Sequence, residues 1–119
     1  MSDLSFSKKD RLLDAGAYKR VFDGVETRAS HKHLLLLAAK NNLPHDRLGL
    51  VISKKNVKLA VQRNRIKRVI REFFRSHPAQ GSGLDVVVLA RKGMDQLDNA
   101  ALSSILRLQW QQLTDNIPS

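Results

Sequence analysis

The sequence predicts an α+β fold with elements in the order α-β-β-β-α-β-α, and three stretches of the chain carry this prediction. Residues 47–53 alternate larger apolar side chains with smaller ones, which is the period of a strand. Residues 85–90 contain an unbroken apolar run typical of a buried strand. Between them, residues 57–75 repeat apolar side chains at the spacing of an amphipathic helix. At 119 residues, the chain fits a single domain over positions 1–119.

The N-terminal half predicts one helix followed by two strands. Asp14 can cap a helix over residues 15–23, in which Tyr18, Val21 and Phe22 recur at helical spacing before Gly24 ends it. Strands are expected over residues 26–30 and 34–40, and the polar segment 41–46 is typical of a loop.

The strand predicted over residues 47–53 has two unlike faces. One face carries Leu48, Leu50 and Ile52. The other carries Gly49, Val51 and Ser53, which are smaller, so we expect another backbone to approach closely there.

The helix predicted over residues 57–75 separates its apolar and basic side chains, and Asn56 is its candidate N-cap. Its apolar stripe consists of Ile66, Val69, Ile70 and Phe73. A basic row at a spacing of four residues, flanked by Arg65 and Arg68, consists of Arg63, Lys67, Arg71 and Arg75. Packing and charge therefore occupy different faces.

The C-terminal part predicts a central strand and a final helix. Pro78 and the segment 81–83 should end the basic helix and form a flexible connection. The strand at 85–90 is expected inside the sheet because apolar side chains fill both of its faces. A last helix should start after Asp98, end at about Thr114 and turn inward Leu102, Ile105, Leu106, Trp110 and Leu113. Residues 1–8 and 115–119 are expected to be frayed.

Charge is the strongest functional signal in the chain. Residues 47–76 hold ten of the 21 Lys and Arg residues and a single acid, Glu72, a local excess of nine against +10 for the whole chain. A helix face that is merely solvated favours alternating signs, whereas the like-charged neighbours here cost on the order of 1 kcal/mol together. A polyanion that neutralises this face is therefore favoured over simple solvation.

Composition excludes several other classes of protein. Cysteine is absent, which removes disulfides, thiolate metal sites and cysteine nucleophiles. The longest apolar run, residues 34–39, is far shorter than the roughly 18 residues of a membrane span. Residues 1–9 lack the apolar core of a signal peptide, so we expect a cytoplasmic protein without membrane contact.

RNA is the favoured polyanion. Guanidinium groups suit phosphates and base edges, and Asn64 between two arginines can pair with a base or a ribose hydroxyl. A DNA-binding helix-turn-helix would need a short helix just before the basic one, where this sequence predicts a strand and a basic loop.

Three motifs carry a family resemblance. They are Leu48-Gly49-Leu50-Val51-Ile52-Ser53-Lys54-Lys55, Arg63-Asn64-Arg65-Ile66-Lys67-Arg68-Val69-Ile70-Arg71-Glu72, and Asp85-Val86-Val87-Val88-Leu89-Ala90-Arg91-Lys92-Gly93. In this order they strongly resemble the protein subunit of bacterial ribonuclease P, and the similarity extends from Arg11-Leu12-Leu13 to Trp110.

The resemblance implies an α-β-β-β-α-β-α sandwich, with a mixed four-stranded sheet packed against helices and a left-handed β-α-β crossover. It also implies that a catalytic RNA with Mg²⁺ ions cleaves precursor tRNA, while the protein holds the substrate and supplies no catalytic residue. The expected partners are the catalytic RNA and the 5′ leader of precursor tRNA. One protein monomer is expected for each catalytic RNA.

The resemblance assigns two RNA-binding surfaces. The surface for the catalytic RNA would comprise Lys54, Lys55, Arg63, Asn64, Arg65, Lys67, Arg68 and Arg71. A cleft between the sheet and the first helix would take the leader, lined by Tyr18, Phe22, Val51, Ser53, Lys55 and Asn64. Aromatic rings suit the cleft because every base offers a π-face. Relatives with an aromatic on the second strand differ from this chain, which has leucines at 34–37, so stacking here would rest on fewer residues.

The sequence leaves alternatives open for the cleft residues and for the function. Tyr18 and Phe22 could instead be core residues, and the chain could be a ribosomal-type RNA-binding protein with a structural role. A free-standing hydrolase would need a carboxylate or histidine constellation that the sequence lacks. His31 and His33 have the spacing of a metal-binding pair, but no third ligand lies nearby, so we expect no protein-bound metal. Glu72 is more simply a counter-charge to Arg68 or Arg75 than a general base.

Overall fold

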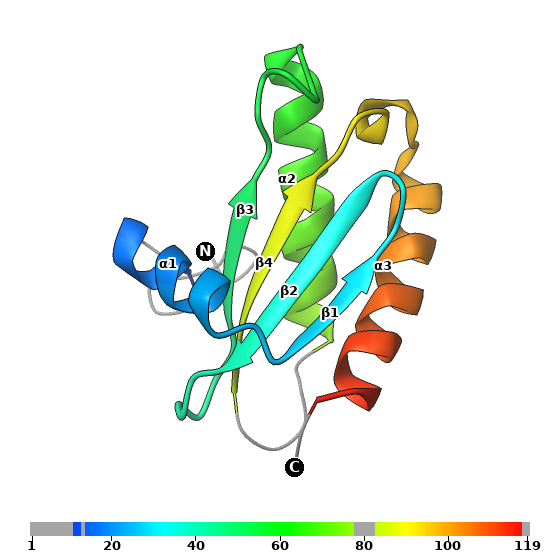
Figure 1. The fold of residues 1–119 in the computed structure, drawn as a ribbon. Coiled ribbons are helices and arrows are strands. Elements are labelled where there is room, and N and C mark those ends of the chain that lie inside the picture. The colour runs from blue at the N-terminus through cyan, green and yellow to red at the C-terminus, as the bar shows by residue number, and fades with distance from the viewer. Residues whose placement is uncertain (1–10, 13, 78–82, 118–119) are drawn as a thin grey trace, which may run out of the picture.

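The computed structural model describes residues 11–12, 14–77 and 83–117. Its elements are α1 (Ala15–Asp23), β1 (Thr27–Ser30), β2 (Leu34–Lys40), β3 (Arg47–Val51), α2 (Ala60–Ser76), β4 (Leu84–Ala90), the 3₁₀ helix η2 (Met94–Gln96) and α3 (Asn99–Asp115) (Figure 1). The predicted element order is confirmed, and η2 is an addition. The segments 1–8, 78–82 and 118–119, which hold much of the predicted frayed ends and flexible connection, lie outside the described residues. Residues 115–117, also predicted to fray, are described: Asp115 is the last residue of α3, and the amide of Asn116 donates to the carbonyl of Gln112 at 3.2 Å.

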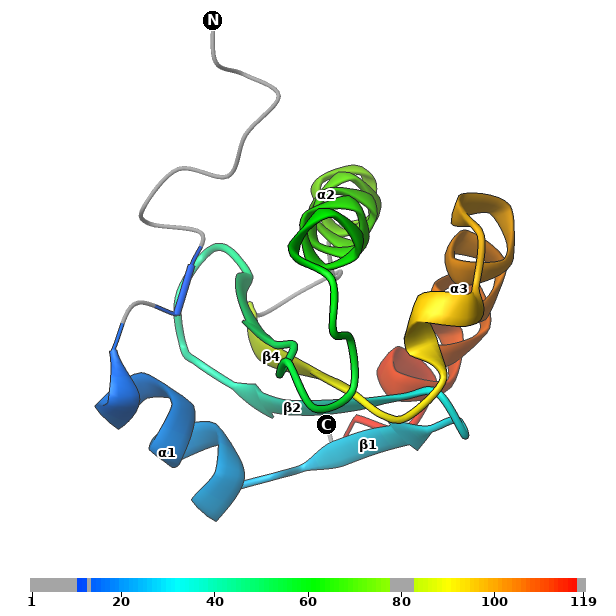
Figure 2. The ribbon, with the colours of Figure 1, turned by 90° about the horizontal axis from the view of Figure 1, so that it is seen from above.

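The four strands form one mixed sheet in the order β1-β2-β4-β3. Strand β2 is antiparallel to β1 and β4, whereas β3 is parallel to β4, with Gly49 opposite Val87. Helix α1 covers one face of the sheet, and α2 and α3 cover the other (Figure 2). The predicted interior position of β4 is confirmed, and it agrees with the apolar side chains on both of its faces.

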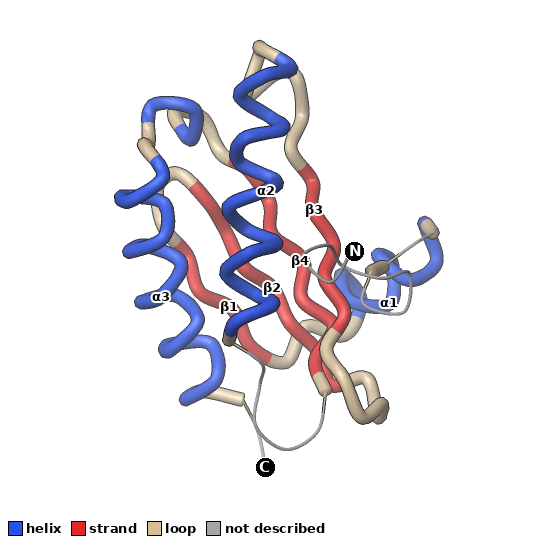
Figure 3. The backbone as a smooth tube through the Cα atoms, turned by 180° about the vertical axis from the view of Figure 1, so that it is seen from behind, coloured by secondary structure: helices blue, strands red, loops and turns tan. Residues whose placement is uncertain are grey.

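The connection from β3 through α2 to β4 is left-handed. The two strands are parallel and point upward in Figure 1. Figure 3 views the molecule from the side of α2, with β4 to the left of β3. The chain leaves β3, passes through α2 in front of the sheet and enters β4 on the left. This path makes the connection left-handed, which is rare for β-α-β units.

Two apolar clusters hold the layers together. The larger lies between the sheet and the helices α2 and α3, and fully buried examples are Leu36, Ile66, Ile70 and Leu106. The smaller lies under α1 and comprises Leu12, Ala17, Val21, Leu37 and Val87. Burying a side chain of this size contributes about 1.5–3 kcal/mol, so these contacts fix the sheet and α2 relative to each other.

Helix α2 begins three residues later than predicted, and its N-cap is Leu59 rather than Asn56. Residues 53–57 form a turn in which the amide groups of Asn56 and Val57 donate to the carbonyl of Ser53. The Asn56 side chain donates instead to the carbonyl of Ala90 at 3.0 Å. Asn56 therefore ties this turn to the end of β4, a tertiary role that the capping preference did not reveal.

None of the helices in the described ranges combines the length and apolar character needed to cross a bilayer.

Candidate nucleic-acid interface

Helix α2 presents basic side chains on the sides that do not face the core. Its buried side consists of Ile66, Ile70, Phe73 and Phe74. The remaining sides face α3, the edge of β3 and solvent, and each carries a different subset of the predicted RNA-binding residues.

Two of the predicted RNA-binding arginines also have structural partners. Arg63 donates to the carbonyls of Val57 and Lys58 at 3.0 and 2.8 Å, which holds the turn before α2. Arg65 donates to Gln62 and to Asn99 of α3, both at 2.8 Å. These bonds orient the two guanidinium groups and leave other donors on each of them, since a guanidinium has five.

The outward side of α2 carries Asn64 and Arg68, whose side chains are exposed and make no hydrogen bond to another described residue. Lys54 and Lys55 are exposed in the turn before the helix. Further along α2, Glu72 pairs with Arg75 at 2.9 Å, which confirms one of the two counter-charges predicted for it. The cations nearer the helix N-terminus therefore remain available to a ligand.

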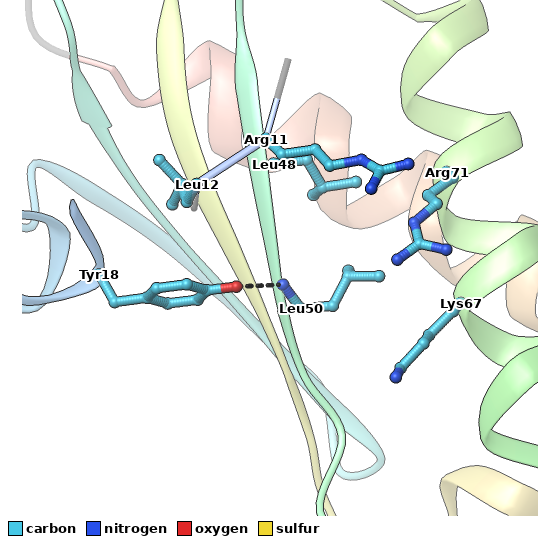
Figure 4. Close-up of a pocket in the computed structure, with 7 residues that line it drawn as sticks. All are labelled: Arg11, Leu12, Tyr18, Leu48, Leu50, Lys67 and Arg71. Atoms are coloured by element: carbon cyan, nitrogen blue, oxygen red, sulfur yellow. Dashed lines mark hydrogen bonds between the residues drawn. The ribbon is translucent and has the colours of Figure 1, made fainter. Parts of the chain in front are cut away.

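The third side of α2 faces a hollow at the edge of β3 (Figure 4). Its lining residues are Arg11, Leu12, Tyr18, Leu48, Leu50, Lys67 and Arg71. Arg11 Nε is buried without a hydrogen-bond partner among the described residues. Burial, with a smaller contribution from the charge of Arg11, lowers the pKa of Arg71. Three cations that form no salt bridge with another described residue thus converge on one hollow, an arrangement suited to an anion.

Arg11 is a candidate site residue that the sequence reasoning missed. It lies before the first predicted element, and it reaches the hollow because its backbone forms a bridge beside Leu48. The amide of Leu12 continues this pairing by donating to the carbonyl of Leu48 at 3.1 Å. The Arg-Leu-Leu run at 11–13 offered the only sequence signal, through the family resemblance.

Tyr18 closes the same edge of β3. The amide of Leu50 donates to its hydroxyl at 3.1 Å, and a Cβ at Gly49 would lie 2.6 Å from its ring. The expectation that a backbone approaches the small face of β3 is therefore wrong at Gly49, because an aromatic side chain occupies that space. The ring is half-buried beside the cluster under α1.

The other predicted cleft residues are open to solvent. Phe22 is 43% exposed and Val51 is 38% exposed, and Ser53 is also exposed. Core packing thus accounts for part of the Tyr18 ring, whereas Phe22 belongs to neither apolar cluster. Their contact with a leader stays a prediction.

His31 and His33 lie together at the turn between β1 and β2, with ring centroids 5.5 Å apart. His33 Nδ1 is 3.0 Å from the carbonyl of Lys92. Among residues 11–12, 14–77 and 83–117, no group of three or more His, Asp or Glu side chains could hold a metal ion.

Comparison with known proteins agrees with this geometry. The sequence profile of the family described as Ribonuclease P matches residues 6–114. The chain belongs to the ribonuclease P protein family. It is 49% identical over 118 residues to the ribonuclease P protein component of Pseudomonas aeruginosa, covering 99% of this chain and 87% of that relative. Against the component from Marinobacter nauticus the identity is 49% over 113 residues, covering 95% and 85% of the two chains.

Solved structures of ribonuclease P proteins share the fold. The protein from Staphylococcus aureus superposes with a TM-score of 0.77 at 26% identity, covering 86% of this chain and 93% of that one. The protein from Thermotoga maritima gives a TM-score of 0.73 at 26% identity, with 92% and 98% covered. The predicted α+β class and the mixed four-stranded sheet are thereby confirmed.

Proposed function

We propose that this chain is the protein cofactor of ribonuclease P, which binds the catalytic RNA and the 5′ leader of precursor tRNA to promote removal of that leader. Membership of the family makes it part of an endoribonuclease complex that contains an RNA. The observation that carries the finer proposal is the outward side of α2, where Asn64 and Arg68 have no partner in the described part of the protein.

The catalytic RNA would contact α2 and the turn before it. Exposed cations on a rigid helix position a phosphate backbone, and Asn64 adds a group able to pair with a base edge or a ribose hydroxyl. The bonds from Arg65 to Gln62 and Asn99 hold its guanidinium at the boundary of this surface. Such preorganisation reduces the entropy lost on binding.

The leader would lie on the α1 side of the sheet, where Phe22, Val51 and Ser53 are exposed. The hollow with Arg11, Lys67 and Arg71 adjoins Tyr18 at the edge of β3. A phosphate bound there would connect a strand on the sheet face with RNA on α2. The two surfaces therefore meet around one edge of the sheet.

We assign the cleavage chemistry to the catalytic RNA. Mg²⁺ ions held by that RNA would supply the activated water and stabilise the leaving oxygen. The residues of this chain would bind and orient the two RNAs, and we propose no protein residue as acid, base or metal ligand.

The proposal is tested by reconstituted cleavage at low Mg²⁺. Precursor tRNA is incubated with the protein alone, the catalytic RNA alone and both together. We expect no cleavage by the protein alone and faster cleavage by the pair than by the RNA alone. Cleavage by the protein alone would contradict the proposal, and no change on adding protein would favour a structural role of the ribosomal type.

Arg65→Ala should weaken binding of the catalytic RNA by about 1–3 kcal/mol if the Arg65 guanidinium makes a bidentate contact with the RNA. It should lower the free energy of unfolding by only about 1 kcal/mol, because one of the two lost hydrogen bonds is exposed and the other is only partly buried. Arg65→Lys keeps the charge without the fork and should recover only part of the affinity. RNA titration and thermal unfolding of the three proteins check this, and loss of the folding transition would show that Arg65 is mainly structural.

A further inference from the structure

Three turns lie at one end of the sheet, the upper end in Figure 1. They are the turn 53–56 before α2, the turn 91–93 after β4 and the hairpin tip 31–33 between β1 and β2. Asn56 joins the first to the second by donating to the carbonyl of Ala90 at 3.0 Å. Arg91 joins the second to the third, because its guanidinium donates to His31 O and Ser30 Oγ, both at 2.9 Å.

The hairpin tip and the turn after β4 are further fixed by His33. Its backbone carbonyl accepts the amide of Arg91 at 3.0 Å, and its ring lies 3.0 Å from the carbonyl of Lys92. Gly93 has a φ of 89°, and a Cβ there would lie 2.7 Å from the His33 ring. The two turns therefore form one structural unit, although about 60 residues separate them in sequence.

The charged side chains of the three turns at this end of the sheet are all basic. The three turns contain no Asp or Glu, and they carry Lys32, Lys54, Lys55, Arg91 and Lys92. The salt bridges of the described residues are Lys19–Asp23, Arg47–Asp85 and Arg75–Glu72, so these five cations take part in none. Partial burial, and then the charges of His33, Lys32 and Arg91, lower the pKa of His31, as a cationic environment requires.

Acidic groups lie elsewhere. At the opposite end of the sheet, Glu26 accepts the amide of Lys40 at 2.6 Å, Asp46 accepts the amide of Leu84 at 2.8 Å, and Asp85 pairs with Arg47 at 2.6 Å. Beyond the turn 91–93, Asp95 and Asp98 line a separate hollow with Arg65. The row of turns thus carries cations with no acidic group among them, whereas these acids lie at the other end of the sheet or beyond the turn 91–93.

We propose that the three turns form a cationic rail that binds the phosphodiester backbone of the catalytic RNA, through Lys32 and Lys92 in addition to Lys54 and Lys55. The rail crosses the sheet from β3 to β1, three strand spacings or about 14 Å. It extends the α2 surface to the far edge of the sheet, and it rests on the proposed function. The lysines are exposed, and the turns that carry them are joined by the hydrogen bonds of Asn56, Arg91 and His33, which suits contact with phosphates irrespective of sequence.

The test is the double variant Lys32→Ala/Lys92→Ala, titrated with the catalytic RNA over a series of salt concentrations. Its matched control, Lys40→Ala/Arg107→Ala, removes the same charge from β2 at the opposite end of the sheet and from the exposed side of α3. Arg68→Ala reports on the α2 surface. Thermal unfolding of each variant establishes that it is folded.

We expect the rail variant to bind the catalytic RNA about tenfold more weakly than the control, with a salt slope shallower by about 2. If rail and control variants bind alike while Arg68→Ala binds weakly, the rail is refuted and the proposed function stands. If the rail variant loses affinity only when precursor tRNA binds the assembled holoenzyme, the catalytic RNA is not the ligand of the rail, and that part of the proposal is refuted. If Arg68→Ala also has no effect, the α2 surface itself, and with it the proposed function, fails.

Discussion

Raising the salt concentration from about 50 to about 200 mM should weaken binding of the catalytic RNA to this protein by about a thousandfold. The exposed cations of α2 and its preceding turn would displace counterions from about 5–7 phosphates, which gives a log–log slope of roughly −4 to −6. No acid other than Glu72 lies within residues 47–76 to offset them, and Glu72 already pairs with Arg75. This is the largest effect that the proposed interface predicts.

Titrations at five or more salt concentrations measure this slope directly. A slope shallower than about −2 would mean that phosphate contacts are too few for the basic side of α2 to be the binding surface.

The double variant Tyr18→Leu/Phe22→Leu should weaken holoenzyme binding of precursor tRNA with a long leader by about 1–3 kcal/mol for each base that loses its stacking partner. Leucine keeps most of the apolar volume and removes the π-face. Precursor tRNA with a one-nucleotide leader should bind nearly as it does to the wild-type holoenzyme. Affinity for the catalytic RNA should also change little, because the two sites are separate and their effects should be close to additive.

Two single variants separate stacking from stability. Tyr18→Phe keeps the ring but leaves the amide of Leu50 without its acceptor, the Tyr18 hydroxyl at 3.1 Å, so any loss of affinity in this variant comes from the strand edge. Phe22→Leu removes a ring that is 43% exposed and has no hydrogen bond to lose. If long-leader and one-nucleotide-leader substrates weaken equally, or only the folding stability drops, the cleft assignment is wrong.

The order of elements could be predicted from the sequence because each element has a clear local period or cap. Asp14 accepts the amide of Ala17 at 2.8 Å at the start of α1, as the capping preference indicated. The Val-rich centre of β4 likewise indicated a strand with neighbours on both sides. These signals arise within a few residues of the chain, where spacing alone is informative.

Features that depend on tertiary contacts could not be predicted in this way. Asn56 looks like a helix cap in sequence, yet its side-chain amide donates to the carbonyl of Ala90 at the end of β4. The hollow beside β3 needs Arg11, which lies outside any periodic segment. Lys32 and Lys92 come to the same end of the sheet because β2 pairs with β4, with Leu34 opposite Ala90, and because Arg91 and His33 join the adjoining turns. Counting charges along the sequence identifies the basic helix, but it misses cations that only the fold brings together.

The central claim is that the outward side of α2 binds the catalytic RNA, and a comparison of Arg68→Ala with Arg107→Ala tests it most directly. Both arginines are exposed on a 17-residue helix, α2 or α3, and neither side chain makes a hydrogen bond to another described residue. The two substitutions therefore change charge and helix surface alike. We predict that Arg68→Ala weakens binding of the catalytic RNA by about 1–3 kcal/mol, while Arg107→Ala stays within about 0.5 kcal/mol of wild type. Equal affinities for the two variants would contradict the account.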